Sequence, residues 1–242
     1  MDTTPYQKFA KENLGFEFKD PRLLVTALTH RSYVNEHKIA APEQNERLEF
    51  LGDAVLELVA SDYLYRNYKY SEGVMTALRA ALVRTESIGA AGKDVGYEPL
   101  VRLSKGEQQG TDRAHESIMA DCFEAVIGAI YLDQGYEEAR KFIEKHILVK
   151  TEVIIKEESW RDPKSYVQEL AQKIDGVTPV YQTLKEDGPD HNKTFTVGLY
   201  VENKMISEGV GHSKQDAQTE AARAGVRWYK TKYGDKLAKL IA

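Results

Sequence analysis

The hydrophobic pattern of the chain changes once, near Pro163, and this change restricts the folds that the chain can adopt. Over residues 1–150 apolar residues recur every three or four positions, and no strand-like alternation of useful length occurs. The same spacing over residues 139–156 predicts one further continuous helix. The first part of the chain is therefore predicted to be all-α.

The pattern after Pro163 is mixed. Residues 164–174 have helical spacing, and Asp162 is the predicted N-cap residue in front of the proline. Three segments then fit strands and the last fits a helix, namely 180–184, 194–201, 204–210 and 213–229. An order of helix, three strands and helix in so few residues predicts a small α+β domain.

The two parts also differ in charge. The net charge of the chain is −5, but the 82 residues from Arg161 onward carry 13 basic and 11 acidic side chains, so the excess of acids lies before that point. This asymmetry favours two domains with different roles. We expect a first domain at 1–156, a linker at 157–161, a second domain at 162–231 and a C-terminal tail at 232–242.

Cysteine content and hydropathy exclude several classes of protein. The single cysteine, Cys122, excludes an internal disulfide framework and a cysteine-based zinc site. No apolar run approaches the roughly 20 residues of a membrane span. The first residues lack the basic and apolar regions of a secretory signal. We therefore expect a cytoplasmic protein without a membrane partner.

Acidic side chains gather on two predicted helices. Glu46, Glu49 and Asp53 fall within one narrow sector of a helix, although like charges so placed repel one another. Asp121 and Glu124 are three positions apart in an otherwise apolar segment. Each acid alone fits an ordinary exposed helix position, but the two clusters together favour a site for a divalent cation, because acids among core residues are costly to bury without compensation. Oxygen ligands favour Mg²⁺ or Mn²⁺, and such clusters support phosphodiester hydrolysis. His30 is interpreted as a structural residue.

The segment Asn45-Glu46-Arg47-Leu48-Glu49-Phe50-Leu51-Gly52-Asp53 closely resembles the signature of the ribonuclease III endonuclease domain. Residues 24–33, 72–83 and 120–133 resemble the neighbouring segments of that family. The resemblance implies that the metal-binding catalytic carboxylates are Glu49, Asp53, Asp121 and Glu124. It also implies accessory acidic roles for Glu46 and Glu72 and a subunit contact for Phe50. The segment 110–117 departs from the family in being less glycine-rich and less basic, which affects expected loop contacts rather than the chemistry.

The C-terminal part resembles a double-stranded RNA-binding domain. The resemblance is carried by Asp162-Pro163-Lys164, the loop 188–191, Phe195 and Val197 on a strand, and the segment 209–214. It implies RNA contacts by Gln168, Glu169, His191, Ser213 and Lys214. Gln215 stands where the family usually has a second lysine, so we expect weaker RNA binding than a fully basic module gives.

Together the two resemblances cover nearly the whole chain and imply an enzyme of the bacterial ribonuclease III type. Such an enzyme is a homodimer that uses Mg²⁺, with Mn²⁺ as a substitute and no other cofactor. It cleaves double-stranded RNA to 5′-phosphate and 3′-hydroxyl ends with short 3′ overhangs, and it processes ribosomal and other structured RNA precursors. Two alternatives stay open, a duplex-RNA-binding protein with a degenerate nuclease domain and a metal-dependent DNA nuclease. The presence of all four carboxylates disfavours the first, and a domain suited to A-form duplexes disfavours the second.

Overall fold

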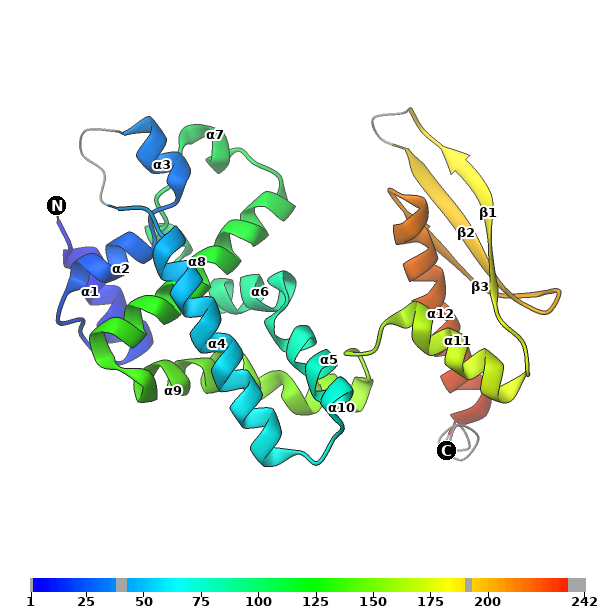
Figure 1. Ribbon diagram of the computed structural model, residues 1–242. Helices are drawn as coiled ribbons and strands as arrows, with labels where there is room; N and C mark the ends of the chain where they lie inside the picture. Colours follow the sequence, from blue (N-terminus) through cyan, green and yellow to red (C-terminus); the bar gives the residue numbers. More distant parts are fainter. Residues whose placement is uncertain (1, 38–42, 190–192, 235–242) are drawn as a thin grey trace. The chain divides into compact units, whose positions relative to one another are not determined.

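The computed structural model describes residues 2–37, 43–189 and 193–234 (Figure 1). The chain divides into two compact units, Met1–Trp160 and Arg161–Ala242. The first is helical and the second combines a sheet with two helices, and each has its own hydrophobic core. This confirms the predicted fold classes. Within the described ranges, no helix combines the length and the apolar character that crossing a bilayer requires.

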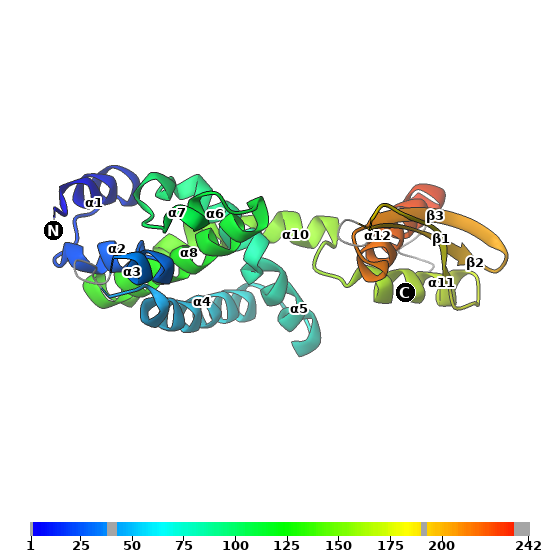
Figure 2. The ribbon, with the colours of Figure 1, turned by 90° about the horizontal axis from the view of Figure 1, so that it is seen from above.

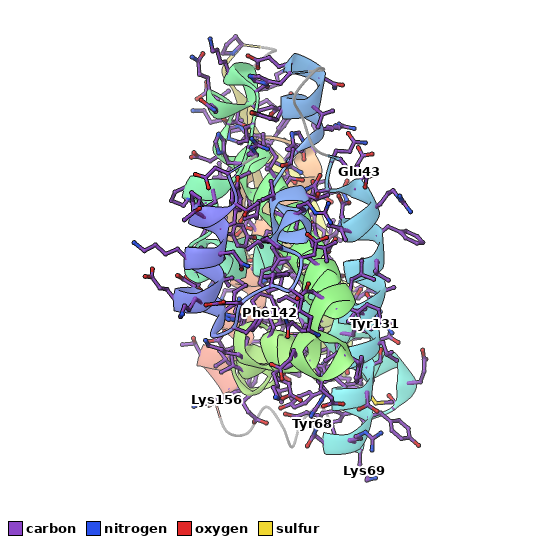
Figure 3. All side chains as sticks on the ribbon, turned by 90° about the vertical axis from the view of Figure 1, so that its left-hand side faces the viewer. Glu43, Tyr68, Lys69, Tyr131, Phe142 and Lys156 are labelled. Atoms are coloured by element: carbon purple, nitrogen blue, oxygen red, sulfur yellow. The ribbon has the colours of Figure 1, made fainter. Side chains whose placement is uncertain are left out.

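The first unit is built around two long helices, α4 (Glu46–Asn67) and α8 (Asp112–Gln134), which lie side by side (Figures 1 and 2). Figure 3 labels Glu43, shortly before α4 begins, and Lys69, shortly after it ends. The other α-helices are α1 (Thr4–Phe9), α2 (Pro21–Ala27), α3 (Arg31–Glu36), α5 (Glu72–Val83), α6 (Thr85–Val95), α7 (Lys105–Gln108), α9 (Tyr136–His146) and α10 (Thr151–Glu157). Short π or 3₁₀ turns occupy Ala10–Leu14, Glu98–Leu100 and Leu148–Lys150.

Helix α8 forms the centre of this unit, because helices cover it on most sides. Phe123, Ile127 and Ile130 have no exposed surface, and the ring of Phe123 lies 5.1 Å from that of Phe142 in α9 (labelled in Figure 3). The buried carboxylate of Asp133, near the end of α8, accepts hydrogen bonds from the backbone N–H groups of Lys19 and Asp20 at 2.9 and 2.8 Å. This acid therefore fixes the N-terminal segment and is satisfied by the fold.

The prediction of one continuous helix over 139–156 is wrong. The chain forms α9, a 3₁₀ turn at Leu148–Lys150 and then α10, which packs against α5. Ile147, Val149 and Thr151 are β-branched and weaken a helix locally, and the Thr151 hydroxyl donates to the Leu148 carbonyl at 2.6 Å. The break redirects the chain so that α10 reaches α5.

The second unit contains α11 (Pro163–Ile174), β1 (Val180–Asp187), β2 (Thr194–Val201), β3 (Lys204–Gly211) and α12 (Lys214–Tyr233). The strands form an antiparallel sheet in the order β1-β2-β3, with both helices on one face (Figures 1 and 2). Val197, Leu199 and Val201 are buried on the helix side, as the alternation predicts. Asp162 accepts from the Ser165 N–H at 2.8 Å, which confirms it as the N-cap of α11.

Helix α12 lies directly on strand β3 because two glycines leave room for it. A Cβ at Gly209 would stand 2.1 Å from the Ala221 nitrogen, and a Cβ at Gly211 would stand 2.5 Å from the Ala217 nitrogen. Ala217 and Ala221 are themselves fully buried. Small residues on both sides therefore set the position of the α12 N-terminus beside the end of β3.

Candidate active site and RNA-binding surface

Two glycines bring the backbones of α4 and α8 into direct contact. A Cβ at Gly52 would lie 1.7 Å from the carbonyl oxygen of Glu124, and a Cβ at Gly128 would lie 2.3 Å from that of Leu48. No side chain fits at either position, so only glycine permits this approach. Gly52 faces the backbone of Glu124, a predicted catalytic acid, and Gly128 faces the backbone of Leu48, which directly precedes Glu49. The contact therefore places Glu49 and Asp53 of α4 beside Asp121 and Glu124 of α8.

The beginning of α4 is fixed by buried polar groups. The backbone N–H of Asn45 donates to the Thr29 carbonyl at 3.0 Å, and its side-chain amide approaches the Cys122 sulfur on α8 at 3.8 Å. The Asn45 carbonyl accepts from the Leu48 and Glu49 N–H groups. Asn45 is almost fully buried, with 1% of its surface exposed. Because Glu49 is one turn further on, these bonds position its carboxylate.

His30 has a structural role in the same region. Its Nδ1 accepts from the Ser32 N–H at 3.3 Å and lies 2.8 Å from the Ser32 hydroxyl, which in turn accepts from the Ser104 N–H at 3.1 Å. This arrangement caps α3 and joins it to the segment before α7. Burial lowers the pKa of His30, which favours the neutral ring that this capping requires.

Glu49, Asp121 and Glu124, at the helix contact, have raised pKa values. Burial, followed by the charges of Asp121 and Glu46, raises the pKa of Glu49 from 4.5 to about 7. Burial, followed by the charges of Asp53 and Glu49, raises the pKa of Glu124 from 4.5 to about 8. Burial also raises the pKa of Asp121, although His30 and Arg31 oppose the shift. The acids of the two helices therefore repel one another across the contact, and nearby positive side chains do not fully offset their negative charges.

The donor set fits a hard divalent cation. All four groups are carboxylates, which is the ligand type that Mg²⁺ and Mn²⁺ prefer. Added positive charge would offset the repulsion that, after burial, raises the pKa values of Glu49 and Glu124. In the portion of the chain that the structure describes, no three His, Cys, Asp or Glu side chains are close enough together to hold an ion. Ion binding therefore requires side-chain rotation, while the helix backbones are already in place.

The predicted accessory acids occupy two different places. Glu46, at the start of α4, accepts from Gln44 at 2.7 Å and lies 3.8 Å from Arg31. Its charge contributes to the raised pKa of Glu49, so it borders the four carboxylates. Glu72 begins α5 and accepts from the Thr76 hydroxyl at 3.0 Å. It lines a groove of about 450 Å³ beside the second half of α4, together with Asp62.

An apolar strip runs along the exposed side of α4. Phe50, Leu58 and Tyr65 expose 81%, 58% and 72% of their surfaces. These positions fall within a sector of about 80° at helical spacing. Leu58 and Tyr65 also line the groove that contains Glu72. Exposed large apolar residues in such a row are typical of an interaction surface.

In the second unit, the predicted RNA-binding residues lie on α11 and at the start of α12. Gln168 is exposed, and Glu169 is paired with Arg161 at 3.3 Å and Lys173 at 3.5 Å. Ser213 caps α12 by accepting from the Asp216 N–H at 3.0 Å. Lys214 is paired with Glu186 at 2.7 Å. His191 lies outside the described residues.

Sequence reasoning did not assign a role to the two glycines of the helix contact or to Asn45. Gly52 and Asn45 are visible in the acidic segment, and Gly128 follows the second acidic pair, but no local pattern shows which backbone each will touch. A glycine inside a helix is unfavourable by about 1 kcal/mol relative to alanine, and this is the signal that could have drawn attention to both.

Comparison with known proteins gives matches over both units. Residues 20–151 match the family model described as Ribonuclease-III-like, and residues 163–229 match the double-stranded RNA binding motif. The chain is 42% identical over 221 residues to Ribonuclease 3 of Streptococcus pneumoniae strains CGSP14 and 70585, which covers 91% of this chain and 95% of each relative.

A solved structure gives a corresponding result for the fold. The nuclease domain of ribonuclease III from Campylobacter jejuni superposes with a TM-score of 0.51 at 39% identity, covering 57% of this chain and 96% of that one. The solved nuclease domain covers little more than half of this chain, which agrees with the division of the chain into a helical unit and a second, smaller unit. On these matches and on the paired carboxylates of α4 and α8, the chain belongs to the ribonuclease III family of endoribonucleases.

Proposed function

We propose that the chain is a divalent-metal-dependent endoribonuclease that hydrolyses the strands of double-stranded RNA. The observation that carries this proposal is the contact of α4 with α8, which holds Glu49 and Asp53 beside Asp121 and Glu124. The second unit belongs to a double-stranded RNA binding family and provides the means of recognising the substrate.

Glu49, Asp53, Asp121 and Glu124 would hold Mg²⁺, for which Mn²⁺ would substitute. The cation supplies positive charge at the reacting phosphate and lowers the pKa of water. Glu49 and Glu124 have pKa values of about 7 and about 8 in the cation-free chain, so each exchanges a proton near neutral pH. Glu46 adds negative charge at the border of the site, and Glu72 extends the acidic surface along α4.

A homodimer would place one such site against each strand of the duplex. The apolar strip of Phe50, Leu58 and Tyr65 is the surface that a second copy would cover. The solved relative from Campylobacter jejuni is described as having a region involved in dimer formation. Hydrolysis at two offset positions would leave 5′-phosphate and 3′-hydroxyl ends with short 3′ overhangs.

The second unit would bind the duplex through α11, the β1–β2 loop and the start of α12. The proposed contacts are Gln168, Glu169, His191, Ser213 and Lys214. The N-terminus of α12 adds a favourable field for a phosphate beside Lys214. We place the domains at 1–156 and 162–231, with 157–161 as linker and 232–242 as tail. Processing of ribosomal and other structured RNA precursors in the cytoplasm is the proposed role.

The direct test is incubation of the purified protein with a long RNA duplex, with Mg²⁺ or with EDTA. Parallel reactions contain single-stranded RNA, a DNA duplex of the same sequence and the Glu124→Gln variant. We expect cleavage only of the RNA duplex, only with the cation and only by the unmodified protein. Binding without cleavage would instead indicate an RNA-binding protein with an inactive nuclease domain. Cleavage of DNA at the same rate would contradict the assigned substrate.

A further inference from the structure

One carboxylate in the second unit faces two lysines on the proposed RNA side. Glu186, near the end of β1, has Oε1 2.7 Å from Lys214 Nζ and Oε2 3.9 Å from Lys193 Nζ. Lys214 is the first residue of α12, and Lys193 directly precedes β2. The cross-strand partner of Glu186 is Phe195, and Lys214 Nζ lies 5.5 Å from the centre of that ring. The four side chains therefore form one cluster on the helix side of the sheet.

We propose that Glu186 is an intramolecular counterion that competes with RNA phosphates for Lys214 and Lys193. The inference rests on the proposed role of Lys214 in binding the duplex. In the free protein this carboxylate partly compensates the charges of the two lysines, so a phosphate must displace it or share each ammonium group with it. Glu186 therefore sets how much these lysines contribute to affinity.

The surrounding sequence increases the importance of this pairing. After Lys214 the first turn of α12 continues with the neutral Gln215 and the acidic Asp216, so no further cation is added there. On β1, Lys185 is in turn paired with Asp187 at 2.7 Å. Carboxylates therefore accompany these lysines on both faces of the strand, Glu186 on the helix side and Asp187 on the opposite side. The electrostatic attraction for a polyanion is smaller than the number of lysines suggests.

The magnitude follows from the exposure of the pair. The side chains of Lys214 and Glu186 are 56% and 38% exposed, and solvent-exposed ion pairs contribute little. Releasing both lysines from the carboxylate is therefore expected to tighten RNA binding about two- to fivefold. A lysine that gains a full phosphate contact also steepens the dependence of log affinity on log salt by up to about 1.

The test compares Glu186→Gln with a matched control in the full-length protein. Glu208→Gln removes the same charge from the same sheet, but Glu208 is exposed on the opposite face, where it is the cross-strand partner of Gly198. Binding of a labelled RNA duplex is measured by fluorescence anisotropy in EDTA, over KCl from about 50 to 300 mM. We expect Glu186→Gln to bind more tightly and with a steeper salt dependence than both the unmodified protein and Glu208→Gln. Equal affinity in the two variants, or weaker binding by Glu186→Gln, would overturn the inference.

Two further variants separate this inference from the proposed function. Lys214→Ala should weaken binding, and in that background the gain from Glu186→Gln should shrink, because one of its two lysines is gone. If Lys214→Ala binds as well as the unmodified protein, the proposed RNA contact is wrong and the inference fails with it. If Lys214→Ala weakens binding but Glu186→Gln does not tighten it, only the inference fails. Melting temperatures of all variants confirm that the sheet is intact.

Discussion

Replacing Glu124 with Gln is expected to stabilise the cation-free protein while it abolishes cleavage. Burial and the charges of Asp53 and Glu49 raise the pKa of Glu124 to about 8. A carboxyl whose pKa is raised by folding binds its proton more tightly in the folded state than in the unfolded state. Stability is therefore greatest below the unfolded pKa of 4.5 and falls as the pH rises towards 8. An amide has nearly the same shape and carries no charge, so it removes this loss.

The size of the effect follows from the pKa difference between the two states. Between pH 4.5 and pH 7 the full shift corresponds to about 3 kcal/mol in the free energy of unfolding. Glu124 is only partly buried and its titration is coupled to that of Glu49, so solvent and neighbouring charges reduce this to about 1–2 kcal/mol. For a unit of this size, the melting temperature should rise by about 3–6 °C at pH 7.

Differential scanning calorimetry of the nuclease transition, in EDTA at pH 5, 6, 7 and 8, measures this effect. The difference between Glu124→Gln and the unmodified protein should grow with pH. Glu116→Gln, the same change two turns earlier on α8 and outside the four carboxylates, is the matched control. With Mg²⁺ present the unmodified protein should gain more stability than Glu124→Gln, because the cation binds the ionised carboxylates. A variant that is less stable than the unmodified protein at pH 8 in EDTA would refute the assigned electrostatics.

Three other changes test separate parts of the proposal. Gln215→Lys should raise affinity for all RNA duplexes alike and steepen the salt dependence by about 1, and an unchanged slope would mean that the start of α12 does not face phosphates. A mixed dimer of one unmodified and one Glu124→Gln subunit should nick duplex RNA, leaving one strand whole on a denaturing gel. Equal cutting of both strands in a single turnover, with subunit exchange excluded, would contradict the assignment of one site to each subunit. Gly52→Ala should lower the free energy of unfolding by about 1–3 kcal/mol or more and reduce cleavage, because the new Cβ would stand 1.7 Å from the Glu124 carbonyl oxygen. A cleavage rate and melting curve like those of the unmodified protein would show that the helix contact is not needed.

The fold was largely predictable because local patterns and the tertiary structure agree. Helical spacing identified the all-α part, and period-two alternation identified the strand that buries Val197 and Leu199. The helix predicted over 139–156 failed because its apolar spacing continues through a break at Leu148–Lys150. Spacing alone does not show that the chain must turn there for α10 to reach α5.

The candidate site was predictable in its residue types but not in its construction. The acidic positions stand out because carboxylates are unusual beside core residues. Their mutual approach depends on Gly52 and Gly128, and the contacts of these residues come from a helix more than 70 positions away in the chain. The pairing of Glu186 with Lys214 depends likewise on how α12 lies on the sheet. Contacts of this kind are determined by packing, which no local pattern specifies.

The contact between α4 and α8 also explains how one chain keeps four acids together. Repulsion among them tends to separate the helices, and side-chain packing alone could yield to it by small shifts. Here the backbones themselves touch, at the carbonyl groups of Glu124 and Leu48, and the buried face of α8 surrounds that contact. The helices therefore stay in place, and the repulsion can be relieved only at the side chains, by rotation, by protonation or by a bound cation. This is why raised pKa values and affinity for a divalent cation are expected at the same residues, and why protons compete with the cation there.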